Sequence, residues 1–288
     1  MTTIDHISTR PGGSDIPAGK AYFETSTNKF VVWNGSSWID LHSDGDGTGA
    51  IANQYSVDFD GTNDVISGPA VGTTVGTCSM WFYNDDVITT SSVGQVLLNS
   101  KSYNFGIVLG NQTGLSNEVI AIQYSGGRFG YTGAGLSIPS GWHHVMVAWV
   151  SNSSTNSGNA GYDIWLDGVK VGNDSQSAPS SPETLATSGN GFHIGARLGT
   201  GSVYRPFDGK IDEFAVWSTD VSSDISTIYN GGAGAVDLNA LSTAPEIWWR
   251  MGDDDAGTGT TITNQGSEGS NANGTLVNGP IFSSDVPS

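Results

Sequence analysis

The residues of this chain that come nearest to a catalytic pair are two adjacent carboxylates, Asp212 and Glu213. Hydrolysis of a glycosidic bond needs two carboxyl groups, about 5–5.5 Å apart in a retaining enzyme and about 6.5–9.5 Å apart in an inverting one. Successive side chains of a β-strand point to opposite faces of the sheet. If residues 211–217 form a strand, these neighbours cannot make such a pair, and the sequence predicts that the protein is not an enzyme.

The same carboxylates could bind a metal. Alternation would place Asp212 on the strand face of Phe214 and Val216, with Glu213 on the other face. An ionised carboxylate beside apolar neighbours is costly unless it is paired or binds a metal. Two interpretations therefore stay open: a structural Ca²⁺ site using Asp60, Asp212 or Glu213 with backbone carbonyls, or hydrogen bonds to backbone amides, Arg or Lys.

Other candidate sites are weaker. Residues 44–49 begin like an EF-hand loop, but Tyr55 stands where the bidentate Glu is required. His143 and His144 are strand neighbours that diverge, so they cannot chelate one ion together. Cys78 lies in an apolar strand and is expected in the core rather than as a nucleophile.

A sugar ligand would favour exposed aromatic side chains beside Asn- and Asp-rich loops. Four aromatic residues could serve, and each could equally be core packing: Tyr103, Tyr131, Tyr204 and Trp217. The sequence does not place the glycan site among them.

The composition limits the partners. There are 28 acidic and 10 basic residues, a formal net charge of −18, so phosphate backbones and anionic lipid surfaces are repelled. We therefore expect no nucleic acid partner and no membrane insertion. The single cysteine allows no intrachain disulfide. The first residues lack a basic region followed by an apolar stretch, so we expect no signal peptide and synthesis in a cytoplasm.

The elements that position these residues are mostly strands. Gly is abundant, with 41 residues, and only 13% of residues are charged, which is typical of short strands joined by tight turns. Asp167 and Gly168 fit a type I′ hairpin turn. One short helix is expected over residues 222–232. The expected strands after residue 53 are 55–59, 77–83, 95–98, 104–109, 119–124, 142–150, 162–166, 169–171, 192–195, 211–217 and 246–251.

The first 45 residues differ from the rest. Residues 9–17 read as an extended arm, and strands are expected over 21–25, 30–33 and 38–41. Residues 43–49 read as a flexible linker. We therefore predict an all-β protein with two domains: a small N-terminal arm and β-hairpin region over 1–45, for anchoring or oligomerisation, and a two-sheet antiparallel jelly-roll sandwich over 46–288.

The sandwich resembles the concanavalin A-like lectin/glucanase superfamily in its laminin-G-like branch. The segments that carry the resemblance are 55–66, 141–145, 162–168, 207–214 and the helix end 228–232. The resemblance implies two stacked antiparallel sheets and a role in binding glycans or proteins. Related domains often hold a structural calcium near residues 207–213. Retaining glucanases of the superfamily carry a Glu-x-Asp-x-Glu strand, which residues 210–214 lack.

The end of the chain, 248–253 and 274–280, is similar to a block that opens many domains of this branch, so the last strand is expected to pack beside residues 55–59 or the fold is permuted. This tail and residues 33–38 are also similar to segments of virion structural proteins of tailed bacteriophages. That similarity implies a non-catalytic capsid decoration, fibre or tail component located on the virion. Its expected partners are other virion proteins, further copies of itself in a homo-oligomer such as a trimer, and host glycans. The alternatives are a free or cell-surface carbohydrate-binding lectin and, third, a glycoside hydrolase.

Overall fold

The computed structural model describes residues 5–7, 21–24, 29–33, 38–40, 51–100, 105–111, 119–124, 127–131, 137–150, 161–171, 181–186, 191–199 and 202–288. The chain divides into two compact units, Met1–Ile51 and Ala52–Ser288.

The N-terminal unit holds a four-stranded sheet in the order β1-β2-β3-β4. Its strands are β1 (Asp5–Ile7), β2 (Ala21–Glu24), β3 (Lys29–Trp33) and β4 (Trp38–Asp40). The three expected strands are confirmed as an antiparallel meander, and β1, which pairs parallel with β2, was not predicted. Tyr22, Val31 and Trp33 are buried within this unit.

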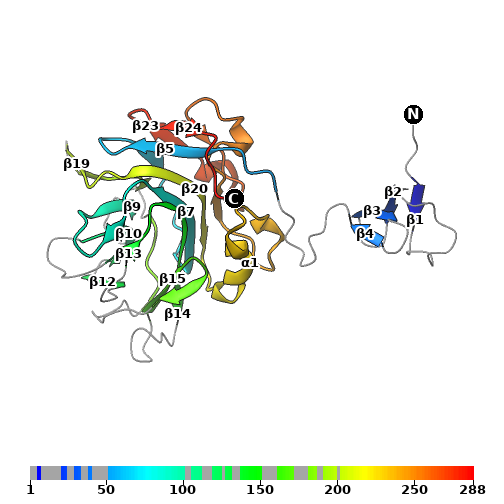
Figure 1. Cartoon of the computed structure of the whole chain (residues 1–288), viewed down its shortest axis with the longest axis horizontal. Coiled ribbons are helices and arrows are strands. Elements are labelled where there is room, and N and C mark those ends of the chain that lie inside the picture. The colour runs from blue at the N-terminus through cyan, green and yellow to red at the C-terminus, as the bar shows by residue number, and fades with distance from the viewer. Residues whose placement is uncertain are drawn as a thin grey trace. The chain divides into compact units, whose positions relative to one another are not determined.

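The second unit is a sandwich of two large sheets (Figure 1). The first sheet has the order β16-β15-β14-β7-β20-β5-β24, with β21 also paired to β20. Its strands are β5 (Ser56–Asp60), β7 (Thr77–Asn84), β14 (Gly141–Val150), β15 (Gly161–Leu166), β16 (Val169–Val171), β20 (Asp208–Trp217), β21 (Ile247–Trp249) and β24 (Ile281–Ser283).

The second sheet has the order β12-β11-β10-β9-β17-β6-β23-β22. Its strands are β6 (Val65–Gly68), β9 (Gln95–Ser100), β10 (Phe105–Leu109), β11 (Ile120–Tyr124), β12 (Gly127–Tyr131), β17 (Phe192–Ile194), β22 (Thr261–Ile262) and β23 (Gly274–Val277). Two short pairs complete the strands: β8 (Ile88–Thr89) with β13 (Ser137–Ile138), and β18 (Arg197–Gly199) with β19 (Ser202–Tyr204). The predicted all-β sandwich is confirmed.

The core lies between the two sheets. Alternate residues of β7 and β20, such as Phe82 and Phe214, point inward and are fully buried. The Phe214 ring lies beside the ring of Phe192 in the second sheet, at a centroid distance of 5.9 Å, and the Phe192 ring stacks on Trp249 at 5.2 Å. Each fully buried side chain of this size contributes roughly 1.5–3 kcal/mol relative to an exposed one. These contacts hold the two sheets together.

The ends of the sandwich unit meet in both sheets. β24 pairs with β5, and β23 pairs with β6, so the last strands of the chain lie beside the first strands of the unit. The last strand, β24, therefore packs beside residues 55–59, which is the first of the two predicted arrangements of the tail. The segment around Trp248 instead forms β21, which pairs with β20.

The turns and helix follow the sequence. Asp167 and Gly168 have φ angles of +50° and +73°, as the predicted type I′ hairpin turn requires. The single α-helix of the described residues is α1 (Ile225–Tyr229), and short 3₁₀ segments cover Ser222–Asp224, Asn230–Gly232, Leu238–Ala240, Asp253–Asp255 and Gly269–Ala272. The Tyr229 ring stacks on Trp81, which places α1 on the outer face of the first sheet, away from β9 and β10 (Figure 1). Among the described residues, no helix is long and apolar enough to cross a membrane.

Candidate functional site

The two carboxylates expected on opposite faces lie on one face, because β20 contains a bulge. Asp212 pairs with Trp81 and Ala215 pairs with Ser79, so three steps on β20 match two on β7. Glu213 takes up the extra residue with a φ angle of +47°. A bulge shifts the alternation of the side chains by one position. The predicted faces were therefore wrong.

After the bulge, Phe214 and Val216 point into the core, and Glu213 stays with Asp212 on the outer face. That face is covered. The exposed fractions of Asp212 and Glu213 are 0% and 4%, so no sugar can reach either carboxylate. The two carboxylates that the sequence analysis compared with a hydrolytic pair are therefore buried inside the protein.

Protein groups hydrogen-bond both carboxylates. Asp212 accepts from the Asn53 amide at 3.0 Å and from the Glu213 backbone N–H at 2.8 Å. Glu213 accepts from the Trp248 indole at 2.6 Å and from Arg250 Nε at 3.2 Å. The hydrogen-bonding interpretation of these residues is thus the arrangement present in the structure.

Burial dominates the ionisation of this pair. It raises the pKa of Asp212 well above its ordinary value, and the nearby Glu213 raises it further. Burial also raises the pKa of Glu213 to about 7, although the Arg250 charge and the Trp248 hydrogen bond act in the opposite direction. A carboxyl group in low dielectric favours its neutral form.

Asp60, the third residue expected at a calcium site, lies elsewhere. It ends β5 at the surface, where its carboxylate accepts from the backbone N–H of Thr62 at 2.8 Å. Its partner on β20 is Asp208, four residues before Asp212, which is about 13 Å along a strand at ~3.3 Å per residue. The three carboxylates do not form one set of ligands. Over the part of the chain that the structure describes, no cluster of three His, Cys, Asp or Glu side chains is placed to hold a metal ion.

The other sequence candidates are structural. His144 shares the outer face with Ser79, which it contacts at 2.8 Å, whereas His143 lies opposite Phe82 and pairs with Asp167 at 2.8 Å. The expected divergence of the two histidines is confirmed. Cys78 is fully buried in the core, as predicted.

The aromatic candidates for sugar contact divide in a similar way. Trp217 is fully buried and donates its indole N–H to the Thr243 carbonyl, so of the two alternatives for this residue the structure supports packing rather than sugar contact. Tyr204 is 50% exposed and remains available. Tyr103, the Tyr131 side chain and the EF-hand-like segment 44–49 fall outside the described residues.

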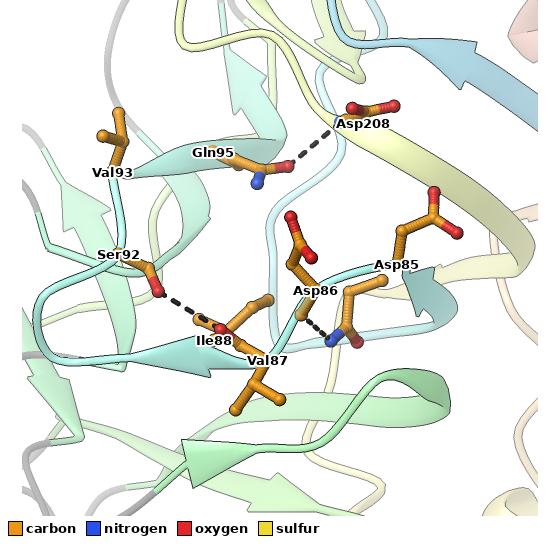
Figure 2. Close-up of a pocket in the computed structure, with 9 residues that line it drawn as sticks. Asp85, Asp86, Val87, Ile88, Ser92, Val93, Gln95 and Asp208 are labelled. Carbon is orange, nitrogen blue, oxygen red and sulfur yellow. Dashed lines mark hydrogen bonds between the residues drawn. The ribbon is translucent and has the colours of Figure 1, made fainter.

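An open cleft that the sequence did not indicate lies at one end of the sandwich. It has a volume of about 550 Å³ and occurs where the chain crosses from β7 in the first sheet to β9 in the second. Its lining comes from the end of β7, the crossover loop, and the starts of β9 and β20 (Figure 2). The lining residues are Asn84, Asp85, Asp86, Val87, Ile88, Ser92, Val93, Gln95 and Asp208.

The cleft is strongly acidic. Figure 2 shows Asp85 and Asp86 next to each other on the loop, with their carboxylates on the side where Gln95 and Asp208 lie. Burial raises the pKa of Asp208, and Asp85, Asp60 and Asp86 raise it further. Among the described residues no Lys or Arg forms an ion pair with Asp85, Asp86 or Asp208. Among the described residues, no ion pair therefore compensates the negative charge of these three carboxylates.

Asn84 holds the crossover loop in place through side-chain hydrogen bonds. It is 2% exposed, and its amide N–H groups donate to the carbonyls of Asp86 and Pro139, both at 2.7 Å. Its Oδ1 has no hydrogen-bond partner among the described residues. Buried polar atoms are nearly always paired, so this acceptor is a candidate contact for a ligand or water.

A half-buried aromatic pair lies next to the cleft on the outer face of the first sheet. Tyr83, directly before Asn84, meets Trp142 edge-on at a centroid distance of 5.7 Å. Lys210 lies over the Tyr83 ring at 4.3 Å and pairs with Asp285 at 3.2 Å. The Trp142 indole donates to the same carboxylate at 3.0 Å. Lys210 is thus engaged outside the cleft.

One signal in the sequence could have located the cleft. Asn84, Asp85 and Asp86 follow a long apolar strand directly, and binding residues are frequent on loops that a rigid scaffold positions. The contribution of Asp208 was not visible, because it lies more than a hundred residues away and is brought near only by the pairing of β20 with β7.

Comparison with known proteins identifies the class. The family model described as the concanavalin A-like lectin/glucanases superfamily matches residues 60–224, more than half of the chain. The protein belongs to this superfamily. A search of curated proteins found no match.

Two solved structures share the fold at low sequence identity. The first is from Bacteroides ovatus and is described as a candidate carbohydrate-binding protein: TM-score 0.58, 18% identity, covering 94% of this chain and 71% of that one. The second is a heptameric SAP-like pentraxin from Limulus polyphemus: TM-score 0.51, 11% identity, covering 82% of this chain and 98% of that one. At these identities the likeness concerns the fold.

Proposed function

We propose that this protein is a non-catalytic glycan-binding module and that it takes its ligand in the acidic cleft at the crossover from β7 to β9. The observation that carries the proposal is the contrast between two acidic groups. Asp85, Asp86 and Asp208 are exposed in an open cleft, whereas Asp212 and Glu213 are buried. A ligand can reach the first group and not the second.

The chemistry of the cleft suits a sugar. Ligand sites commonly have volumes of about 300–1,000 Å³ and combine apolar walls with a few polar groups that fix orientation. Val87 and Val93, which are 52% and 81% exposed, supply apolar surface, and the carboxylates supply acceptors for sugar hydroxyls. The fold shared with a candidate carbohydrate-binding protein supports the same class of ligand.

The test is glycan binding by the full chain, first on a glycan array and then by calorimetry with the best ligand. The double variant Asp86→Asn with Asp208→Asn should weaken binding at least tenfold. The matched control Asp254→Asn, an exposed carboxylate in a distant 3₁₀ segment, should leave it unchanged. No new reducing ends should appear when the bound glycan is incubated with the protein. Binding that survives the double variant, or release of reducing ends, would reject the proposal.

We propose, more specifically, that this module is a structural component of a virion. The compact N-terminal unit, separate from the sandwich, supports an anchoring or oligomerisation role for residues 1–45. Deleting those residues should abolish incorporation into particles while leaving the sandwich folded. Neighbouring genes without any capsid or tail protein would contradict it and favour a free lectin.

Calcium binding at Asp60, Asp212 or Glu213 also stays a prediction, although these residues do not form one ligand set. A lowered melting temperature in chelator, restored by Ca²⁺, would support it. An unchanged melting temperature, with no calcium found by mass spectrometry, would discard it.

A further inference from the structure

We propose that the acidic cleft selects glycans that carry protonated amines, such as de-N-acetylated amino sugars, over their neutral N-acetylated counterparts. This inference rests on the proposed function, because it names the class of glycan for the same site. It adds a specificity that a lectin fold by itself does not imply.

The polar groups of the cleft favour a ligand that donates hydrogen bonds. When ionised, the three exposed carboxylates, from Asp85, Asp86 and Asp208, accept hydrogen bonds and donate none. The Oε1 of Gln95 already accepts from the Asp208 backbone N–H at 3.0 Å (Figure 2). An ammonium group has three donors and no acceptor, whereas a neutral acetamide has one donor and brings an acceptor into an acceptor-rich site. The lining therefore favours the amine.

The charge of the cleft favours a cation. The three carboxylates have no Lys or Arg ion-pair partner in the described part of the chain, and the formal net charge of the protein is −18. Like charges held together at a partly enclosed site cost free energy, which a bound cation removes. Two basic side chains near the cleft are engaged by other groups: Lys210 by Asp285 and the Tyr83 ring, and Arg205, whose guanidinium lies against Gly94, by the Asn111 carbonyl at 3.3 Å.

The arrangement of the acids favours an amine over a bare metal ion. A divalent ion needs several oxygens at one point, at about 2.0–2.6 Å. Within the described residues, no three acidic or histidine side chains are placed to hold a metal ion. A ligand with several hydrogen-bond donors therefore fits the cleft better than a single ion.

The Asn84 amide also favours a donor, independently of the acids. Asn84 is 2% exposed, lines the cleft, and leaves Oδ1 without a partner among the described residues. An unpaired buried acceptor is unfavourable, and a ligand N–H or O–H that reaches it would remove that cost. The amide and the acids together favour a donor-rich ligand.

The experiment uses the full chain in chelator and a panel in which each amino sugar oligomer is present as the free amine and as the N-acetyl form. Glucosamine, galactosamine and mannosamine trimers serve as probes at pH 6. We expect at least one free-amine trimer to bind tenfold or more tightly than its acetylated twin, with an affinity that falls as salt rises. Asp86→Asn and Asp208→Asn should each reduce that preference, and circular dichroism would show that both variants are folded.

The outcomes separate the two proposals. Equal affinity for both members of every pair would overturn the amine preference and leave glycan binding intact. Absence of binding to the panel and to the glycan array would overturn both. Tighter binding of an oligolysine peptide than of any amino sugar would overturn the glycan assignment in favour of a basic peptide. Binding that appears only when Ca²⁺ replaces the chelator would also overturn the inference, in favour of a bridging ion.

Discussion

Strand β20 carries acidic residues in two regions that differ in exposure to solvent and in the partners of their carboxylates. At its start, Asp208 faces an open cleft with Asp85 and Asp86 and has no ion-pair partner among the described residues. At its bulge, Asp212 and Glu213 are buried and hydrogen-bonded. The comparison teaches that access and partners, rather than the presence of neighbouring acids, decide whether carboxylates can act on a ligand.

The buried region has a structural task. Arg250 lies between Glu213 and Asp253, with the Asp253 carboxylate at 3.0 Å, and it also donates to the carbonyl of Ala52. Asp253 in turn accepts from the backbone N–H of Gln54 at 2.8 Å. The network therefore ties the first residues of the sandwich and the segment after β21 to the bulge of β20.

The largest effect should follow from removing the cation of this network. Arg250→Met leaves buried carboxylates without their counter-charge, and breaking a buried pair in this way costs about 3–5 kcal/mol. Urea denaturation at pH 7 measures the loss. The exposed pair gives the control: Asp285→Asn, at a side chain 48% exposed, should cost less than about 1 kcal/mol. Similar losses for both variants would remove the distinction between the regions.

The next largest effect should be the pH dependence of stability that the buried Glu213 causes. The pKa of Glu213 is raised from 4.5 to about 7, so its contribution to stability is fully present below pH 4.5 and is lost as the pH rises through about 7. Glu213→Gln should flatten this decline. The urea midpoint between pH 4.5 and pH 8 measures it, with Glu268→Gln as the control at a surface turn. An unchanged slope in Glu213→Gln would show that the residue is ionised at no cost.

His144, on the same face, should act with the opposite sign. Burial lowers its pKa from 6.5 to about 4, against an opposing effect of Asp167. Its contribution to stability is present above pH 6.5 and is lost as the pH falls through about 4. His144→Gln should therefore reduce the acid sensitivity that Glu213→Gln leaves intact. Loss of sensitivity at the same pH in both variants would contradict the assignment.

The smallest effect is expected in the cleft. Asp86→Asn removes one of the charges that raise the pKa of Asp208, so that pKa should fall. Stability should change by less than about 0.5 kcal/mol, because the side chain is exposed. NMR titration of the Asp208 carboxyl and a urea curve measure the two quantities. A large loss of stability would mean that the cleft is structural and would weaken its role as a binding site.

Much of the fold was accessible from local patterns. Residues 55–59, which alternate, and residues 142–150, which are apolar on both faces, predicted strands that the structure contains. Asp167 with Gly168 predicted the turn between residues 162–166 and 169–171. The burial of Cys78 and the opposite directions of His143 and His144 were also predicted correctly, because a regular strand fixes the direction of each side chain. The bulge at Glu213 could not be read, since nothing in residues 210–217 marks the extra residue.

The sequence by itself determined the all-β sandwich, because alternating apolar side chains can be buried only when two sheets meet. It also determined the acidity of the surface. Only the tertiary structure decided which acidic side chains are buried and which are exposed in the cleft. That choice depends on pairing between distant strands: β20 with β7 places Asp208 beside Asp85, and β21 with β20 brings Trp248 and Arg250 over Glu213. Such contacts join residues tens to hundreds of positions apart, and no local pattern records them.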